Sequence, residues 1–468
     1  MPELSHRRLS FRAPWVIFWT GFALRIACIL IGHTYRIRTF GDHFDYGFEA
    51  GRIARSVVQG HGYGNPFNGF SGPSAWLPPL YPLLMALGFK LFGVYTNAAA
   101  IFLMICDSVL SAAVAPAVYE IAARCFDAQG IGRRASEKAA PVALWSAWLW
   151  AVYPAALQYA IHWLWEMSLT ACVFSWALVV TLRLRRVGEQ EGEPNNSFKL
   201  WAVFKLWAVF GLLWGVIALS NASLLLCLPA SILWILWPRR ERKQQTANSK
   251  QVHGYDYRSL SQSVAGAILA CVVFTATIAP WIVRNEFTMH AFIPTRDNLG
   301  VEFYQSMLPR NDALPWGTAL PLWPGDPEFQ RFVQMGEVAY GQAKGAEAKA
   351  LLREHPGMFL SRTCNRFLYF WDGPPHPTGR SAAQEYLRQL SYSFLSACGL
   401  FGLALALKRR VPGAWLMMLA FLLVPLPYYL VTVQARFRHP LEPLIAILAV
   451  YLFRSTRSRA ELQQKAIA

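Results

Sequence analysis

The chain has 468 residues, of which 54% are hydrophobic, and it contains 19 tryptophans and 30 phenylalanines. A composition this apolar and aromatic excludes an ordinary soluble protein of this length. The formal charge of +17 does not indicate nucleic acid, because the basic residues form short clusters between apolar segments and no nucleic-acid-binding motif accompanies them. We therefore expect a polytopic membrane protein without a nucleic-acid partner.

Apolar segments long enough to cross a bilayer recur along the whole chain. The first follows the basic stretch MPELSHRRLSFR and has no convincing small-residue cleavage site, so we expect an uncleaved anchor. The segments lie at about 13–33, 97–122, 139–158, 164–182, 200–218, 220–237, 263–281, 389–407, 412–432 and 440–454. They predict an all-α fold with about ten transmembrane helices.

Short basic clusters occur in alternate loops between these segments, within 124–138, 183–199, 239–243, 408–410 and 454–459. If the N-terminus is cytoplasmic, every such cluster lies on the cytoplasmic side, which is the usual orientation of membrane proteins. We therefore predict that both termini are cytoplasmic.

Two segments on the outer side, 34–96 and 282–388, are too long to be simple connections, and we expect the function to lie there. The first contains GDHFDYGFEAGRIARSVVQGHGYGNPF at 41–67. If a helix begins at Asp42, its apolar residues recur at helical spacing on one face. The opposite face then holds Asp45, Glu49, Arg52, Arg55 and Gln59. This pattern predicts an amphipathic helix that lies on the membrane surface and holds its carboxylates at the boundary.

The acidic residues of this loop allow three interpretations. Asp42 can cap the helix, with Asp45 at the third helical position as in a capping box. A catalytic role for one of the carboxylates is the second interpretation. A divalent metal held together with His43 is the third, but the spacing of these residues is not diagnostic of a metal site, so we expect no metal and no other cofactor.

The second outer segment begins as a loop and then becomes helical. Asp326 and Pro327 suit an N-cap and a first helical turn, and two helical runs follow that end near His355 and Trp371. We therefore divide the chain into three parts. They are a transmembrane core at 1–281 whose first outer loop, 34–96, is catalytic, an extracytoplasmic and mostly helical domain at 282–388, and C-terminal transmembrane helices with a cytoplasmic tail at 389–468.

Further charged residues lie at the outer ends of the predicted helices. Glu166 is in the first turn of the fourth span, where the helix dipole favours a carboxylate, and it faces the same water layer as Asp42. The other members of this group are Arg284 after the seventh span and, within QARFRHPLEP, Arg436, Arg438 and His439. Interfacial snorkelling accounts for a single arginine. Three basic residues in four positions on a short outer loop instead favour an anion site.

In the order of these features the sequence resembles the GT-C membrane glycosyltransferases, in particular family 39. That family includes protein O-mannosyltransferases and the bacterial aminoarabinose transferase that acts on lipid A. The resemblance rests on the basic N-terminus and first span, the acidic first outer loop, the segment PPLYPLLMALGFKLFG, a WE pair at the head of the fourth span, and a C-terminal outer domain. Asp42, Tyr46, Ala54 and Gly60 match the generic pattern of the first loop in such proteins.

The resemblance implies a GT-C-like helical bundle with a small outer domain, located in the bacterial inner membrane. Its implied activity moves a sugar from a polyprenyl-phosphate donor to an acceptor hydroxyl of a lipid, glycan or protein on the extracytoplasmic face, with inversion at the anomeric carbon. The first-loop aspartate is the proposed base in such proteins, which corresponds to Asp42, and Glu166 corresponds to an assisting acid. Asp45 and Glu49 are further candidates for the base.

The residue inventory suits this chemistry, because an acceptor hydroxyl must lose a proton and a phosphate leaving group must be stabilised. A carboxylate and a set of fixed cations meet these needs, and the cations would be Arg284, Arg436, Arg438 and His439. A transporter or flippase of a lipid-linked saccharide is the alternative, since it also needs interfacial cations. The sequence shows no inverted repeat and no paired broken helices, which favours the enzyme.

Overall fold

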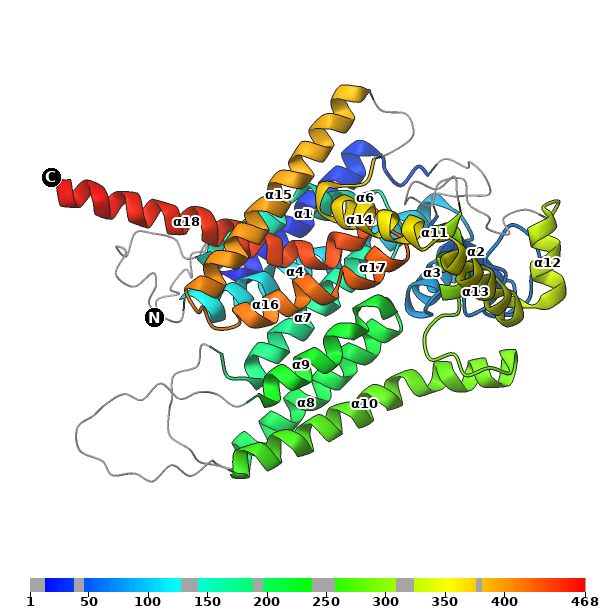
Figure 1. The fold of residues 1–468 in the computed structure, drawn as a ribbon, viewed down its shortest axis with the longest axis horizontal. Coiled ribbons are helices and arrows are strands. Elements are labelled where there is room, and N and C mark those ends of the chain that lie inside the picture. The colour runs from blue at the N-terminus through cyan, green and yellow to red at the C-terminus, as the bar shows by residue number, and fades with distance from the viewer. Residues whose placement is uncertain are drawn as a thin grey trace, which may run out of the picture.

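A computed structural model of the chain describes residues 13–37, 46–127, 142–187, 197–237, 257–308, 324–375 and 381–467. Within these ranges every regular element is helical, apart from one isolated bridge between Gly64 and Pro73. The α-helices form a bundle that carries a group of shorter elements at one end (Figure 1).

The helices follow one another along the chain with short connections. The first half contains α1 (Pro14–Gly32), α2 (Glu49–Val58), α3 (Leu80–Phe92), α4 (Asn97–Ala122), the π-helix η1 (Ala123–Asp127), α5 (Val142–Ala151), α6 (Pro154–Ile161), α7 (Met167–Leu184), α8 (Ser197–Ala218), the 3-10 helix η2 (Ala222–Leu226) and α9 (Cys227–Leu236). The second half contains α10 (Tyr257–Met289), α11 (Leu299–Met307), α12 (Pro327–Met335), α13 (Glu337–Glu354), α14 (Pro356–Asp372), α15 (Ala382–Lys408), α16 (Ala414–Leu423), α17 (Leu426–Leu430), the 3-10 helix η3 (Ala435–Leu441) and α18 (Glu442–Ile467).

Six of the described helices are long and apolar enough to cross a membrane: Pro14–Gly32, Asn97–Asp127, Met167–Leu184, Trp201–Ala218, Ser261–Met289 and Ala382–Lys408. Each corresponds to one of the ten segments predicted from the sequence. Three of the other four form shorter apolar helices, and the last becomes the start of α18. Prolines explain some of the shortening, because α6 begins at Pro154 and the α16–α17 boundary lies at Pro425. The chain is thus an all-α integral membrane protein.

Glycines allow two pairs of long helices to pack closely. A Cβ atom on Gly211 of α8 would lie 2.3 Å from the carbonyl oxygen of Ala270 in α10, and one on Gly402 of α15 would lie 2.3 Å from that of Leu448 in α18. Small residues at such crossings bring helix backbones together, which is how helices associate in a bilayer where lipid is as apolar as leucine. The bundle is therefore held by backbone proximity at these two contacts.

The two outer segments pack against each other. Figure 1 shows α2 and α3 beside α11, α12 and α13, away from the C-terminal end of α18. An aromatic cluster joins them, in which Phe67 contacts Trp76 and Phe332, and Phe332 contacts Tyr340. The predicted helix start is confirmed, since the side chain of Asp326 accepts a hydrogen bond from the backbone N–H of Glu328 at 2.9 Å. The two predicted ends are also confirmed by the bounds of α13 and α14.

The first-loop helix differs from the prediction at its start. It begins at Glu49 and not at Asp42, because Gly47 and Phe48 have φ values of +75° and +48° that interrupt a right-handed helix. A Cβ atom on residue 47 would lie 2.4 Å from the carbonyl oxygen of Leu164, so this position requires glycine. The expected position on the membrane surface is wrong as well, because the charged face is enclosed and Arg52 is only 1% exposed.

Candidate functional site

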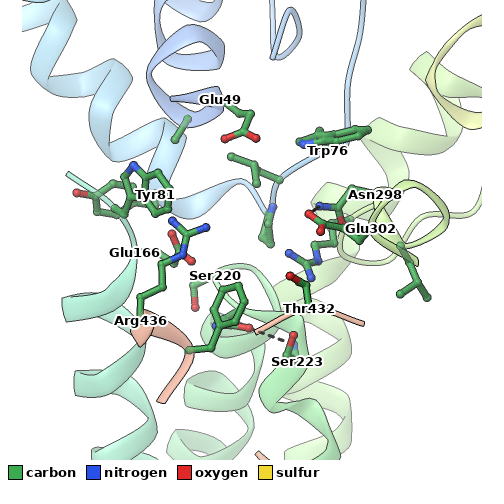
Figure 2. Close-up of a pocket in the computed structure, with 18 of the residues that line it drawn as sticks. Glu49, Trp76, Tyr81, Glu166, Ser220, Ser223, Asn298, Glu302, Thr432 and Arg436 are labelled. Carbon is green, nitrogen blue, oxygen red and sulfur yellow. Dashed lines mark hydrogen bonds between the residues drawn. The ribbon is translucent and has the colours of Figure 1, made fainter. Parts of the chain in front are cut away.

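A cavity of about 160 Å³ opens where the outer segments meet the bundle. Its wall comes from the start of α2, the chain before α3, the start of α7, the α8–η2 turn, the start of α11, and the chain from α17 to η3. Five charged side chains line it: Glu49, Glu166, Arg296, Glu302 and Arg436 (Figure 2). Segments far apart in sequence thus bring three carboxylates and two guanidinium groups to one hollow.

Arg436 is the most distinctive group in this cavity. Its guanidinium carbon lies 3.4 Å from the centre of the Trp165 ring. The Nε and Nη1 atoms are buried and have no hydrogen-bond partner in the part of the chain that the structure describes. A buried polar group without a partner costs about 1–3 kcal/mol, and more when it is charged. The arrangement therefore suits a bound anion that would accept these hydrogen bonds.

The structure places two of the predicted carboxylates beside Arg436. Glu49 is the first residue of α2, and burial raises its pKa to about 7, while the positive charges of Arg436 and Arg52 oppose the shift. Glu166 occupies the N-cap position of α7 but makes no capping hydrogen bond with its side chain. Figure 2 shows its carboxylate next to Arg436 and Tyr81. Both carboxylates are therefore available to a ligand in the cavity.

Asp42 and Asp45, the other two predicted catalytic residues, lie outside the described residues, as does His43. Their roles stay predictions from the sequence.

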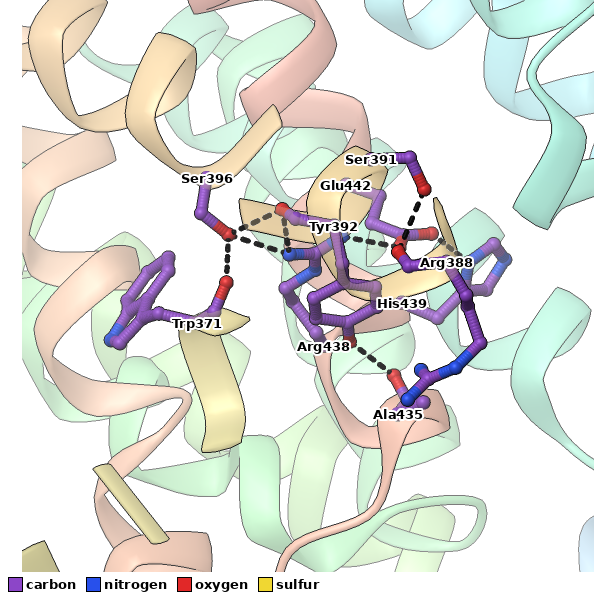
Figure 3. A network of polar contacts seen from close by, with 9 residues as sticks. All are labelled: Trp371, Arg388, Ser391, Tyr392, Ser396, Ala435, Arg438, His439 and Glu442. Carbon is purple, nitrogen blue, oxygen red and sulfur yellow. Dashed lines mark hydrogen bonds and ion pairs between the residues drawn. The ribbon is translucent and has the colours of Figure 1, made fainter. Parts of the chain in front are cut away.

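Arg438 and His439 belong to a different environment from Arg436, although they are its neighbours in η3. Arg438 donates hydrogen bonds to Ser396 Oγ at 2.6 Å and pairs with Glu442 at 3.4 Å, and His439 Nδ1 lies 2.6 Å from the other oxygen of Glu442 (Figure 3). Tyr392 adds a hydrogen bond to the carbonyl of Ala435 at 2.8 Å. This network holds η3 against α15 and α18, and neither basic residue lines the cavity.

Arg284 also lies apart from the cavity lining and is already bonded. Its guanidinium donates to the carbonyl oxygens of Ser74 at 2.7 Å and Tyr63 at 2.5 Å, and to the side chain of Asn285 at 2.8 Å. It thereby attaches α10 to the first outer loop. Of the four basic residues predicted to hold a phosphate, the structure brings only Arg436 to the cavity.

Several polar residues of the cavity were not predicted from the sequence. Tyr81 lines it and donates a 2.8 Å hydrogen bond to the buried carboxyl group of Asp107. Asn298 and Glu302, on α11 and its N-cap, line the side formed by the second outer segment. Their spacing of four residues at the start of a helix was the available signal, but nothing in the sequence tied this stretch to the first loop.

The fold is similar to that of the oligosaccharyltransferase from Archaeoglobus fulgidus in its apo form, with a TM-score of 0.53 and 13% sequence identity. The alignment covers 97% of this chain and 52% of that chain, so the chain spans about half the length of the archaeal protein. A likeness at this identity concerns the fold alone, and it supports the GT-C-like bundle expected from the sequence.

Two further structures align at TM-scores below 0.5. One is the archaeal oligosaccharyltransferase AglB in complex with an inhibitory peptide and a dolichol-phosphate, with a TM-score of 0.48, 13% identity, and coverage of 97% of this chain and 52% of that chain. The other is ArnT from Cupriavidus metallidurans bound to undecaprenyl phosphate, with a TM-score of 0.35, 13% identity, and coverage of 96% and 79%. No family model matches the sequence. No curated protein matches it either.

Proposed function

We propose that the protein is an inverting glycosyltransferase that moves a sugar from a polyprenyl-phosphate donor to an acceptor hydroxyl on the extracytoplasmic face of the membrane. The observation that carries the proposal is the buried guanidinium of Arg436, which has unpaired N–H groups in a cavity shared with Glu49 and Glu166. Arginine suits a phosphate because its planar fork of donors matches phosphate oxygens. The GT-C-like fold and the resemblance in the first outer loop support the same class of reaction.

In this mechanism the acceptor oxygen attacks the anomeric carbon from the face opposite the phosphate. A carboxylate takes the hydroxyl proton, the new C–O bond forms as the bond from the sugar to the phosphate oxygen breaks, and the polyprenyl phosphate leaves with one more negative charge. Arg436 would stabilise that charge as it develops, which is the kind of interaction that accelerates the chemical step. Asp42 is the proposed base, and Glu49 and Glu166 are the candidates among the described residues.

Binding of sugar-free undecaprenyl phosphate to the purified protein tests the central contact. Substitution Arg436→Gln should weaken binding by about 10- to 100-fold, because hydrogen bonds to charged groups are worth about 1.5–3 kcal/mol. The melting temperature should not fall, since the guanidinium has unpaired buried atoms in the free protein. Arg409→Gln is the matched control, because Arg409 follows α15 on the predicted cytoplasmic side. Equal affinity in both variants would remove Arg436 from donor binding.

A further inference from the structure

The side of the cavity away from Glu166 carries a second group of polar side chains. Asn298, Glu302 and Thr432 lie together there, and Trp76 lies beside Asn298 and Glu302 (Figure 2). They come from the start of α11, the first outer loop and the chain that precedes η3. None of these residues is part of the chemistry proposed above, so the reason for their position is a separate question.

Asn298 is held in a way that leaves one of its atoms unused. Its side chain is 2% exposed and stands at the N-cap of α11, but it makes no capping hydrogen bond. The Nδ2 group instead donates to Glu302 at 3.3 Å, and Oδ1 is buried without a partner within the described residues. An Asn at this position normally stabilises a helix by about 0.5–2 kcal/mol through its oxygen. Here that stabilisation is absent, and an acceptor faces the cavity.

The other asparagine of the cavity wall makes a useful comparison. Asn221 accepts a hydrogen bond from the backbone N–H of Ser223 at 3.1 Å and donates to Tyr428 at 3.4 Å, so both ends of its amide are occupied. Ser220, also in the wall, donates to the carbonyl of Val216 at 2.8 Å. Unpaired polar atoms are thus not a general property of this cavity.

Thr432 provides a second unpaired group on the same side. Its Oγ1 is buried and has no hydrogen-bond partner in the described part of the chain. Together the residues offer the amide oxygen of Asn298, the carboxyl group of Glu302 and the hydroxyl of Thr432. Two of the three are chiefly acceptors, so they need a ligand that donates hydrogen bonds.

We propose that Asn298, Glu302 and Thr432 form a subsite for the hydroxyl groups of the donor's sugar. The proposal rests on the proposed function and adds to it the part of the molecule that recognises the sugar. An ionised phosphate presents mainly acceptors and an isoprenoid chain presents neither donors nor acceptors, so neither would satisfy Asn298. A sugar ring carries several O–H donors, and cavities of this kind select ligands through a few well-placed polar groups in an aromatic wall.

Competition between two lipids tests this subsite separately from the phosphate contact. Native mass spectrometry in detergent would measure the ratio of bound glycosylated lipid to bound undecaprenyl phosphate. The glycosylated probes are undecaprenyl phosphates that carry glucose, galactose, mannose or xylose. The variants are Asn298→Leu and Thr432→Val, which remove the polar atoms at similar volume. Ser220→Ala is the matched control, because the hydroxyl of Ser220 is already bonded to the backbone.

The wild-type protein should prefer at least one glycosylated lipid over undecaprenyl phosphate. Each of the two variants should lower that ratio by about five- to tenfold, the effect of one lost hydrogen bond, while the control leaves it unchanged. The melting temperature of the Thr432→Val protein should not fall, because the substitution removes an unpaired buried hydroxyl.

Two results would overturn the subsite alone. One is an unchanged ratio in both variants, and the other is a wild-type protein that binds undecaprenyl phosphate but prefers none of the four glycosylated forms. If the wild-type protein binds no polyprenyl phosphate at all, the proposed function fails and the subsite fails with it.

Discussion

Glu337 joins the two outer segments, and its substitution should change how stability depends on pH. The carboxyl group is 5% exposed at the start of α13 and accepts hydrogen bonds from Ser74 Oγ and from the backbone N–H of Ala75, both at 2.6 Å. Burial raises its pKa from the ordinary value of 4.5 to about 8, although these hydrogen bonds and Arg284 oppose the shift. The folded protein therefore keeps a proton on Glu337 that the unfolded chain releases.

The sign follows from this difference in proton binding. Below pH 4.5 both states hold the proton, and between 4.5 and about 8 only the folded state does, so stability falls as the pH rises through this window. One pKa unit corresponds to 1.36 kcal/mol, which sets a ceiling of about 5 kcal/mol on the loss above pH 8. Glu337→Gln mimics the protonated carboxyl group, so it should match the wild type near pH 5 and be the more stable protein at pH 8.5.

Glu337→Ala provides the contrast. It leaves the Ser74 hydroxyl and the Ala75 N–H buried without their partner, and each such loss costs about 1–3 kcal/mol. The alanine variant should therefore be less stable than the wild type at pH 5, where the glutamine variant is unaffected. Thermal unfolding in detergent at pH 5 and pH 8.5, followed by tryptophan fluorescence, measures all three proteins. A glutamine variant that keeps the pH dependence of the wild type would refute the reasoning.

Three further predictions concern topology and the cavity. Reporter fusions should indicate the cytoplasm at Arg133, Gln245 and Arg409, and an external signal at two of these positions would contradict the predicted orientation. Asp42→Asn should reduce turnover by about 10²- to 10⁴-fold with donor binding retained, whereas turnover near wild type would exclude Asp42 as the base; Asp45→Asn is the parallel control. Because Glu49 loses its proton near pH 7, Glu49→Gln should bind undecaprenyl phosphate more tightly than the wild type above pH 7 and equally below pH 6, and a constant difference across this range would show that charge on Glu49 does not act on the phosphate.

Local signals in the sequence predicted the helices well. Hydrophobic length gave the six long helices, and the pair Asp326 and Pro327 gave the start of α12. These features depend on residues close together in the chain. The contact of Glu337 with Ser74 and Ala75 joins residues about 260 positions apart, so no local pattern could predict it. The cavity depends on such contacts, which is why its second side was missed.

The basic cluster near the C-terminus shows a different limit. The sequence favoured one anion site for Arg436, Arg438 and His439 because the three are close together in the chain. In a 3-10 helix, however, each residue turns by about 120°, so residues two apart differ by about 240° and face different surroundings. Arg436 therefore lines the cavity while Arg438 lies in the network with Glu442. Knowledge of the backbone geometry of η3 was needed to separate them.

The length of α10 has a consequence for the outer end of the molecule. With 33 residues the helix is about 50 Å long at 1.5 Å per residue, whereas the hydrocarbon core of a bilayer is about 30 Å thick. A helix this long must tilt or extend beyond the lipid. Arg284, close to the outer end of α10, is bonded to the first outer loop at Tyr63 and Ser74. A change in bilayer thickness that alters the tilt of α10 would therefore pull directly on the loop that forms one wall of the cavity.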